Sequence, residues 1–296
     1  MGASVDDVIQ RVRLEQYRDN VEEALRILVE ADAEWPDARY RTLAARIRSA
    51  LGHLESRDAY AAAYESFYWA RKGRLTIKHL ERDLRIALGF KTAKTVKRLA
   101  AYPEVQLLER EVRAANVARV LDAGCGEGRV ALTIAARNPT VRVHGIEVSR
   151  TNFRLAQRMN RFPNAAFHQG FLEDAPKRFG RETFDLAYAF AVLEHVVDVD
   201  VAVGAIMDVL EPGGRFCFVV PMNEFVAVGP LPEPTYDEGV AGHVRVFTED
   251  GLRRQFGHYD GFVMEKLPGE LPNKYPDTLA PAEFGAFFVA ISKPKR

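Results

Sequence analysis

The sequence predicts an α/β fold in which a helical N-terminal region precedes a doubly wound, mostly parallel sheet. After Pro103, short apolar runs that end in Gly or Asp alternate with helical segments, which is the pattern of βαβ units. Before Pro103, apolar residues recur at helical spacing with almost no strand-like alternation. We therefore expect a helical domain over residues 1–102 and a sheet domain over residues 103–296.

In the N-terminal region, Val21, Leu25 and Leu28 are spaced to share one face of a helix. A second helix is expected to start at Asp37, directly after Pro36, with Leu43, Ile47 and Leu51 turned inward. Two more amphipathic segments complete the prediction, Leu75–Leu88 and Thr92–Leu99.

The sheet domain is predicted to hold seven strands. The first five are expected to be parallel: Val117–Asp122, Val141–Glu147, Ala166–Gln169, Phe184–Phe190 and Arg215–Val220. The expected helices are Gly128–Arg137, Ser149–Arg161, Val201–Leu210 and Thr248–Phe256. Two late runs, Tyr259–Leu267 and Phe284–Ser292, fit a closing antiparallel hairpin.

Composition narrows the class of protein. Lysine plus arginine equal aspartate plus glutamate at 41 each, so no net field draws the chain to nucleic acid or to a membrane surface. No apolar run approaches the roughly 18–20 residues that cross a bilayer, and we expect no membrane span. Two cysteines, Cys125 and Cys217, are too few for a disulfide framework, so we expect a cytoplasmic protein. The oligomeric state stays open, a homo-oligomer included.

The segment Val120–Arg129, VLDAGCGEGR, places a glycine-rich loop between a predicted strand and a predicted helix. Its spacing, G-x-G-x-G, is neither the dinucleotide fingerprint nor a P-loop. Asp122 and Glu127 add negative charge that would repel a phosphate and suit a cation. Glu147 ends the second strand, where a carboxylate can accept both hydroxyl protons of a ribose. The site therefore predicts a ribose beside a positive charge, a description that S-adenosylmethionine fits.

Four further stretches follow in order along the chain. They are GIEVS at Gly145–Ser149, FDLAYAFAVLEHVVD at Phe184–Asp198, LEPGGRFCFVVP at Leu210–Pro221, and GHVRVFTEDGLRRQF at Gly242–Phe256. With the glycine loop, they resemble the motifs of class I S-adenosylmethionine-dependent methyltransferases, of the subgroup whose fourth motif reads LEHV and which acts on small molecules. The resemblance extends over most of residues 101–296 and implies a Rossmann-like fold.

The resemblance also implies roles for the cofactor-binding residues. Glu147 would hold the ribose hydroxyls and Val148 would pack on adenine. Asp122 would face the methionine amino group, and the Phe190 backbone would lie beside the methionine part. Gly124, Gly126 and Gly128 would let the donor approach the backbone. The alternative for Asp122 and Glu147 is helix capping, and Cys125 is expected to be a small loop residue rather than a reactive thiol.

One departure from the family concerns adenine. The family often has Gly-Asp after the third strand, with the Asp accepting from the adenine amino group, whereas this chain has Gly170-Phe171. Adenine would then be read by the backbone of Phe171 or Leu172, or by the side chain of Glu173 or Asp174. These alternatives stay open.

Candidate catalytic residues are Glu194, His195 and His243. The first two follow the fourth strand at the carboxyl edge of the sheet, where ligands bind in such folds. Either histidine can serve as general base for a hydroxyl acceptor, or Glu194 and His195 can form a structural pair. A divalent metal on the three side chains is the alternative. A related metal-binding cluster of other methyltransferases has a further Glu at the position of Ala191. This chain lacks that ligand, so we predict no metal.

The acceptor is expected to be a small molecule methylated on oxygen: a sugar, a polyketide-like or quinone-like ring, or a lipid-linked precursor. The loop Pro221–Val240 and residues 1–102 would cover the acceptor side, unless the latter serve for oligomerisation. Five aromatic residues, Tyr60, Tyr64, Phe67, Tyr68 and Trp69, are expected to pack against the core domain rather than to form an acceptor wall.

An alternative substrate class follows from the charge distribution. Between Arg71 and Arg98 the sequence has ten basic residues and only two acidic ones, Glu81 and Asp83. This stretch could therefore bind RNA or an acidic protein. The neutral overall charge argues against nucleic acid. A non-enzymatic cofactor-binding or scaffold protein is the third hypothesis, and the intact Asp122, glycines and Glu147 argue against it.

Overall fold

A computed structural model describes most of the chain: residues 4–17, 21–41, 43–44, 57–69, 77–114, 117–222, 247–268 and 285–295. The N-terminal helices are α1 (Val5–Tyr17), α2 (Val21–Glu34), α4 (Arg57–Tyr68), α5 (Ile77–Ala87) and α6 (Phe90–Leu99). His243 and most of the predicted lid, residues 223–240, lie outside the described residues.

The sheet has seven strands in the order β3-β2-β1-β4-β5-β7-β6. The strands are β1 (Arg119–Ala123), β2 (Arg142–Glu147), β3 (Ala165–Gln169), β4 (Phe184–Phe190), β5 (Leu210–Met222), β6 (Asp260–Pro268) and β7 (Gly285–Ser292). The first five run parallel, and β7 pairs antiparallel with both β5 and β6. The predicted α/β fold with its antiparallel C-terminal hairpin is confirmed.

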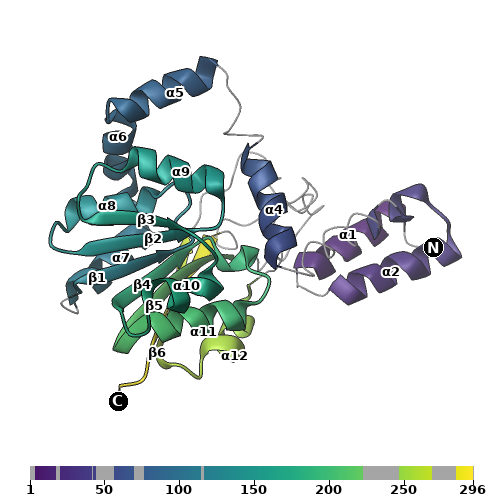
Figure 1. The fold of residues 1–296 in the computed structure, drawn as a ribbon. Coiled ribbons are helices and arrows are strands. Elements are labelled where there is room, and N and C mark those ends of the chain that lie inside the picture. The colour runs from purple at the N-terminus through teal and green to yellow at the C-terminus, as the bar shows by residue number, and fades with distance from the viewer. Residues whose placement is uncertain are drawn as a thin grey trace.

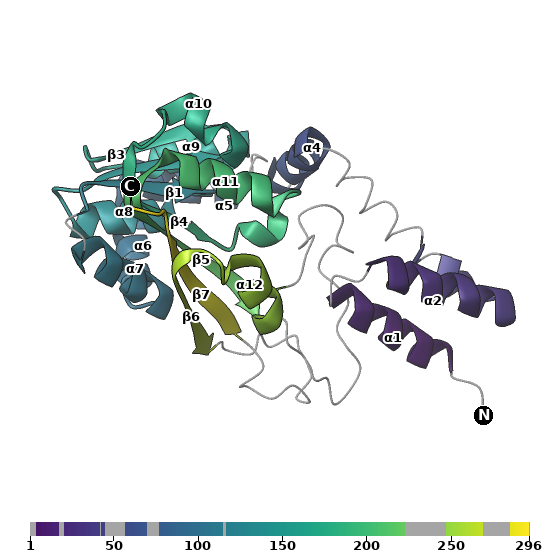
Figure 2. The same ribbon diagram turned by 90° about the horizontal axis from the view of Figure 1, so that it is seen from below.

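Helices cover both faces of the sheet (Figures 1 and 2). One face packs against α7 (Pro103–Ala114), α8 (Arg129–Arg137) and α9 (Arg150–Met159). The other packs against α10 (Ala175–Phe179), α11 (Val199–Val209) and α12 (Glu249–Phe256). Apolar side chains alternate between these two layers along each strand: Val120 faces the first layer, and Leu121 faces the second.

The structure lengthens one predicted strand by several residues and adds two helices to the sheet domain. Strand β5 begins at Leu210 rather than Arg215, because Leu210 pairs with Phe184 and the Pro-Gly-Gly turn is taken up as an irregularity within the strand. Helices α7 and α10 were not predicted. Pro103 is the first residue of α7, a position where the missing N–H of proline costs nothing.

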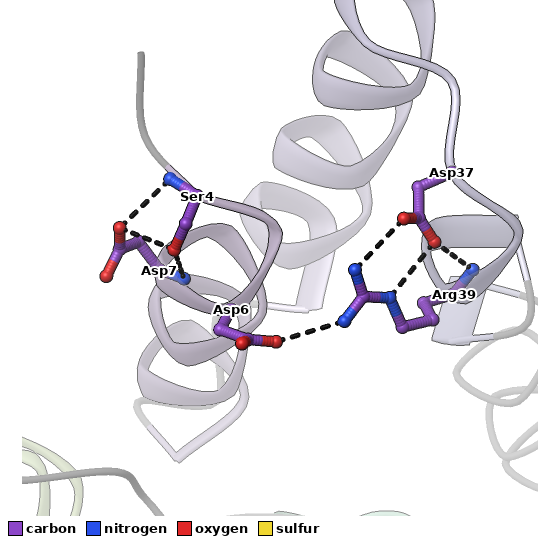
Figure 3. Close-up of polar contacts among 5 residues, drawn as sticks. All are labelled: Ser4, Asp6, Asp7, Asp37 and Arg39. Carbon is purple, nitrogen blue, oxygen red and sulfur yellow. Dashed lines mark hydrogen bonds and ion pairs between the residues drawn. The ribbon is translucent and has the colours of Figure 1, made fainter. Parts of the chain in front are cut away.

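The N-terminal helices α1 and α2 form a small cluster around Val12, Leu28 and Tyr40, which lies beyond α4 and away from the sheet (Figures 1 and 2). Ser4 begins α1 with a capping pair: its hydroxyl donates to Asp7, and the Asp7 N–H donates back to that hydroxyl (Figure 3).

Arg39 links α1 to the start of the helical segment that follows α2, at residues 38–41, because its guanidinium donates to both Asp6 and Asp37 (Figure 3). Helices α5 and α6 lie against the sheet domain instead: Ile86 belongs to the core layer under α8 and α9. The division of the chain at residue 102 stays a prediction.

The glycine loop is shaped by close packing. A Cβ at Gly128 would lie 2.6 Å from the Phe167 ring and 3.1 Å from Ala156, and the residue has φ +73°. The left-handed backbone and the lack of space together require glycine there. The first turn of α8 can therefore sit directly on β2 and β3.

We predict opposite effects for two Gly-to-Ala substitutions. Gly128→Ala should lower the free energy of unfolding by roughly 2–4 kcal/mol, because it adds left-handed strain and a clash with Phe167. Gly204→Ala is the control: Gly204 lies inside α11 with nothing within 4 Å of its missing Cβ, so alanine should stabilise by up to about 1 kcal/mol. Urea unfolding measures both. Equal effects would show that the loop is not packed as described.

Candidate functional site

The candidate site lies at the carboxyl edge of the sheet, between β1 and β4. The strand order reverses there, and in open α/β sheets the connecting loops diverge at such a point and leave a crevice. A pocket opens at this place. Its walls come from the ends of four strands and from α4: Gly124, Ile146–Val148, Gly170–Glu173, Ala191–Val192, His195–Val197, and Arg57, Tyr60, Ala61 and Tyr64.

The end of β1 meets the segment after β4 at very short range. A Cβ at Gly124 would lie 2.6 Å from both methyl carbons of Val192, and Gly124 has φ +83°. Ala191, next to Val192, also adopts a left-handed conformation with φ +54°, which is rare for a residue with a Cβ. Both backbones are therefore held in unusual conformations at the pocket wall, as is common at ligand sites.

Glu147 is held by two backbone amides. Gly126 N–H donates to Oε2 at 2.8 Å, and Ser149 N–H donates to Oε1 at 2.8 Å. The residue is only 4% exposed, yet it lines the pocket. Each carboxylate oxygen has more than one lone pair, so both can also accept from a ligand. The arrangement presents a fixed, oriented acceptor pair at the end of β2.

Asp122 lies beneath the loop and does not line the pocket. Tyr188 donates its hydroxyl proton to Asp122 Oδ2 at 2.8 Å, and the Ala131 N–H in the first turn of α8 also donates to the carboxylate. Burial raises the pKa of Asp122 to about 7, against the opposing effect of these bonds. In this structure, Asp122 secures the loop to β4 and α8.

Cys125 is buried and contacts the face of Gly145. Burial, with the nearby charges of Asp122 and Glu147, raises the pKa of the thiol well above its ordinary value. A thiol kept neutral is a poor nucleophile. The prediction of a small loop residue therefore agrees with the environment of Cys125.

His195 lies in the short turn Leu193–His195 after β4 and lines the pocket. Its Nδ1 is 3.0 Å from the hydroxyl oxygen of Tyr60 on α4, and the ring of Tyr64 lies 5.8 Å from the imidazole, centroid to centroid. A titratable side chain, a hydroxyl and an aromatic wall thus converge at the β4 end of the pocket.

Residues 86–267, well over half of the chain, match the family of methyltransferase domains. The chain belongs to this family. Its class I members take their methyl group from S-adenosylmethionine, as the sequence motifs predicted.

Curated relatives agree. The match to the O-methyltransferase rstn1 of Aspergillus nomiae is 39% identical over 120 residues and covers 39% of this chain and 51% of the relative. The trans-aconitate 2-methyltransferase of Methylobacterium radiotolerans is 31% identical over 153 residues, with 48% of this chain and 56% of the relative covered. The chain spans about half the length of the curated relatives it matches.

A solved structure shares the fold. A chain of the complex between the Haloferax volcanii Trm112 methyltransferase activator and a methyltransferase superposes with a TM-score of 0.52 at 16% identity. The match covers 72% of this chain and 98% of that chain. None of the helices in the described part of the chain has the length and apolar character that crossing a bilayer requires.

The residues of the pocket fit S-adenosylmethionine, the methyl donor of the family. Gly124 presents its backbone at the pocket wall, Glu147 offers two acceptors for a diol, and Val148 and Leu172 give an apolar wall. Five of the predicted binding residues line the pocket: Gly124, Glu147, Val148, Phe171 and Leu172.

The other predicted binding residues support the pocket from outside its lining. Gly126 donates to Glu147, and Gly128 begins α8. Phe190 is half-buried, and its ring lies 5.3 Å from that of Tyr188, centroid to centroid. Residues that sequence reasoning did not place in the pocket are chiefly those of α4, Arg57, Tyr60 and Tyr64. Their spacing along the helix was the available signal.

Glu194 is fully buried, and neither carboxylate oxygen has a hydrogen-bond partner in the part of the chain that the structure describes. Burial raises its pKa to about 8, so the side chain is largely protonated at neutral pH. Glu194 does not line the pocket, while its neighbour His195 does. Within the described residues, no three metal-binding side chains lie close enough to hold a metal ion.

We predict that Glu194→Gln changes how stability depends on pH. The acid ionises near 4.5 in the unfolded chain and near 8 in the folded protein, so the wild type loses stability as pH rises through this window. The variant lacks this loss. Its advantage, the free energy of unfolding of the variant minus that of the wild type, should therefore increase with rising pH by at most about 1.4 kcal/mol per pH unit.

Thermal unfolding at pH 5 and pH 8 measures the effect, with exposed Glu265→Gln as the matched control. An advantage of equal size at both pH values would mean that Glu194 is ionised in the folded protein.

Proposed function

We propose that the protein transfers the methyl group of S-adenosylmethionine to an oxygen atom of a small molecule. The observation that carries this proposal is a single pocket that joins the fixed carboxylate of Glu147 to the Tyr60–His195 pair. The first feature suits a ribose, and the second suits an acceptor that must lose a proton.

In this proposal, the residues divide the donor between them. Glu147 accepts hydrogen bonds from the ribose hydroxyls, and Val148 and Leu172 pack against the base. The backbone at Gly124 and the segment after Phe190 lie beside the methionine part. When bound, S-adenosylmethionine supplies a methyl group already activated by a positive sulfur. The protein mainly has to align the two reactants and exclude water.

His195 is the proposed general base. With the Nδ1 proton donated to the Tyr60 oxygen, Nε2 is the nitrogen that can take a proton from an acceptor hydroxyl. Tyr60 then holds the imidazole in that tautomer and orientation. Glu194 lies beside His195 and is uncharged at neutral pH, so it adds no negative charge to this end of the pocket. We propose no role for His243 beyond that of a second candidate base.

The relatives support a small acceptor. Their names include two O-methyltransferases, several trans-aconitate 2-methyltransferases, and a ubiquinone/menaquinone biosynthesis C-methyltransferase from Syntrophotalea carbinolica. The alternative, RNA or protein held by the basic stretch 71–98, gains no support from the site. None of the described residues in that stretch lines the pocket.

We predict that Glu147→Ala weakens binding of S-adenosylhomocysteine by at least tenfold, because two charge-assisted hydrogen bonds to the ribose are lost. Isothermal titration calorimetry measures the affinity, with Glu265→Ala on the exposed face of β6 as control. Unchanged affinity in Glu147→Ala would contradict the proposed donor orientation.

We further predict that His195→Gln lowers kcat for a hydroxyl acceptor by about 10²–10³-fold. The acceptor is to be found by screening phenols, quinols, sugars and trans-aconitate for release of S-adenosylhomocysteine. His258→Gln is the matched control, since His258 is exposed and its ring contacts that of the neighbouring Tyr259, away from the pocket lining. A His195→Gln enzyme with wild-type kcat on a hydroxyl acceptor would remove the base from the proposal.

A further inference from the structure

Helix α4 runs along the pocket. Its four pocket-lining residues, Arg57, Tyr60, Ala61 and Tyr64, recur at the i, i+3, i+4 and i+7 positions of one helical face. At 1.5 Å per residue, this stripe is about 10 Å long. Tyr60 and Tyr64 meet His195 at the β4 end, whereas Arg57 meets the residues that follow β3.

Specific bonds fix α4 in this position. Glu65 lies one residue beyond the stripe and accepts from the Ser149 hydroxyl at 2.7 Å, the Thr151 hydroxyl at 2.7 Å and the Thr151 N–H at 3.2 Å. Ser149 and Thr151 begin α9, where unpaired amides and the helix dipole favour a carboxylate. The same turn holds Glu147, so α4 is anchored next to the proposed ribose position.

The end of the pocket that would hold the adenine ring differs from the family pattern. Phe171 stands where the family often has an aspartate, and the guanidinium of Arg57 lies 4.5 Å from the centre of its ring. Arg57 Nη1 is also 3.4 Å from Asp174 Oδ2, so that carboxylate is paired with the arginine. Glu173, which lies between Phe171 and Asp174 in the sequence, lines the pocket, whereas Asp174 does not.

We propose that α4 completes the donor site: Arg57 covers the adenine ring of the donor, and Glu173 accepts the hydrogen bond from the adenine amino group. This inference rests on the proposed function. It assigns to Glu173 a task that the residue after Gly170 performs in many relatives, and it brings into donor binding a helix from the N-terminal region.

The two residues contribute in chemically distinct ways. A carboxylate only accepts hydrogen bonds, so Glu173 favours an amino group at position 6 of the purine and disfavours a carbonyl oxygen there. The guanidinium of Arg57 is flat and stacks on aromatic faces, so it stabilises any purine. Glu173 should therefore set the selectivity between bases, and Arg57 should set the affinity for both.

Calorimetric titration with two probes tests this division of labour. The probes are S-adenosylhomocysteine and its inosine analogue, in which oxygen replaces the amino group. The wild type should prefer the adenine compound by at least about tenfold. In Glu173→Gln the side-chain amide can also donate to a carbonyl, so the preference should shrink severalfold. In Arg57→Met both affinities should fall by about three- to tenfold at unchanged preference.

Controls separate these effects from misfolding. Glu265→Gln and Arg98→Met change the same residue types at exposed positions and should bind like the wild type. Arg57→Lys keeps the charge but loses the flat surface, and it should resemble Arg57→Met. Thermal unfolding without ligand shows whether each variant is folded.

The outcomes are distinguishable. A wild type that binds S-adenosylhomocysteine, with folded Glu173→Gln and Arg57→Met variants of unchanged affinity and preference, would overturn this inference alone. A wild type that binds neither probe would overturn the proposed function, and this inference with it. The predicted split between selectivity and affinity would support the assignment of both residues.

Discussion

The carboxylate of Glu147 is the contact on which the site depends. It joins the loop after β1, through the Gly126 amide, to the start of α9, through the Ser149 amide. Ser149 continues the connection, because its hydroxyl donates to Glu65 on α4. One buried acid thus aligns two loops and, through one serine, the helix that covers them. In the proposed function, the same acid meets the ribose.

Several features of the site cost stability, and the packed sheet around them offsets that cost. Ala191 adopts a left-handed backbone conformation, and the buried carboxylate of Glu194 has no hydrogen-bond partner among the described residues; each feature costs on the order of 1–3 kcal/mol. Ala191 precedes the turn Leu193–His195 that presents His195 to the pocket, and Glu194 lies within that turn. The strand before them, β4, lies in the middle of the sheet between β1 and β5, where hydrogen bonds on both sides hold it in place.

Most of the sheet and its loop motifs could be predicted because their signals are local. Short runs of apolar residues predicted β2, β3 and β4 within one residue of their bounds, and Ser149 was recognisable as the start of a helix. Glu147 and His195 reached the pocket for the same reason. Glu147 ends β2 and His195 lies in the turn after β4, and parallel strands end at one edge of the sheet.

The rest of the site depends on contacts that no local pattern encodes. Tyr60 meets His195 across 135 positions of sequence, so its aromatic character alone favoured packing against the core over an acceptor wall. Asp122 turns away from the pocket because Tyr188, on the neighbouring strand, is in register with it. The burial of Glu194 follows from tertiary packing around a three-residue turn and has no counterpart in the spacing of residues.

A crystal structure of the protein with S-adenosylhomocysteine tests the central claim most directly. The account predicts ribose hydroxyls on the carboxylate of Glu147, with that residue still bonded to Gly126 and Ser149. It also predicts the purine between Val148 and Arg57, with α4 in its present place. A ligand bound elsewhere, or a Glu147 that makes no contact with the ribose, would contradict the account.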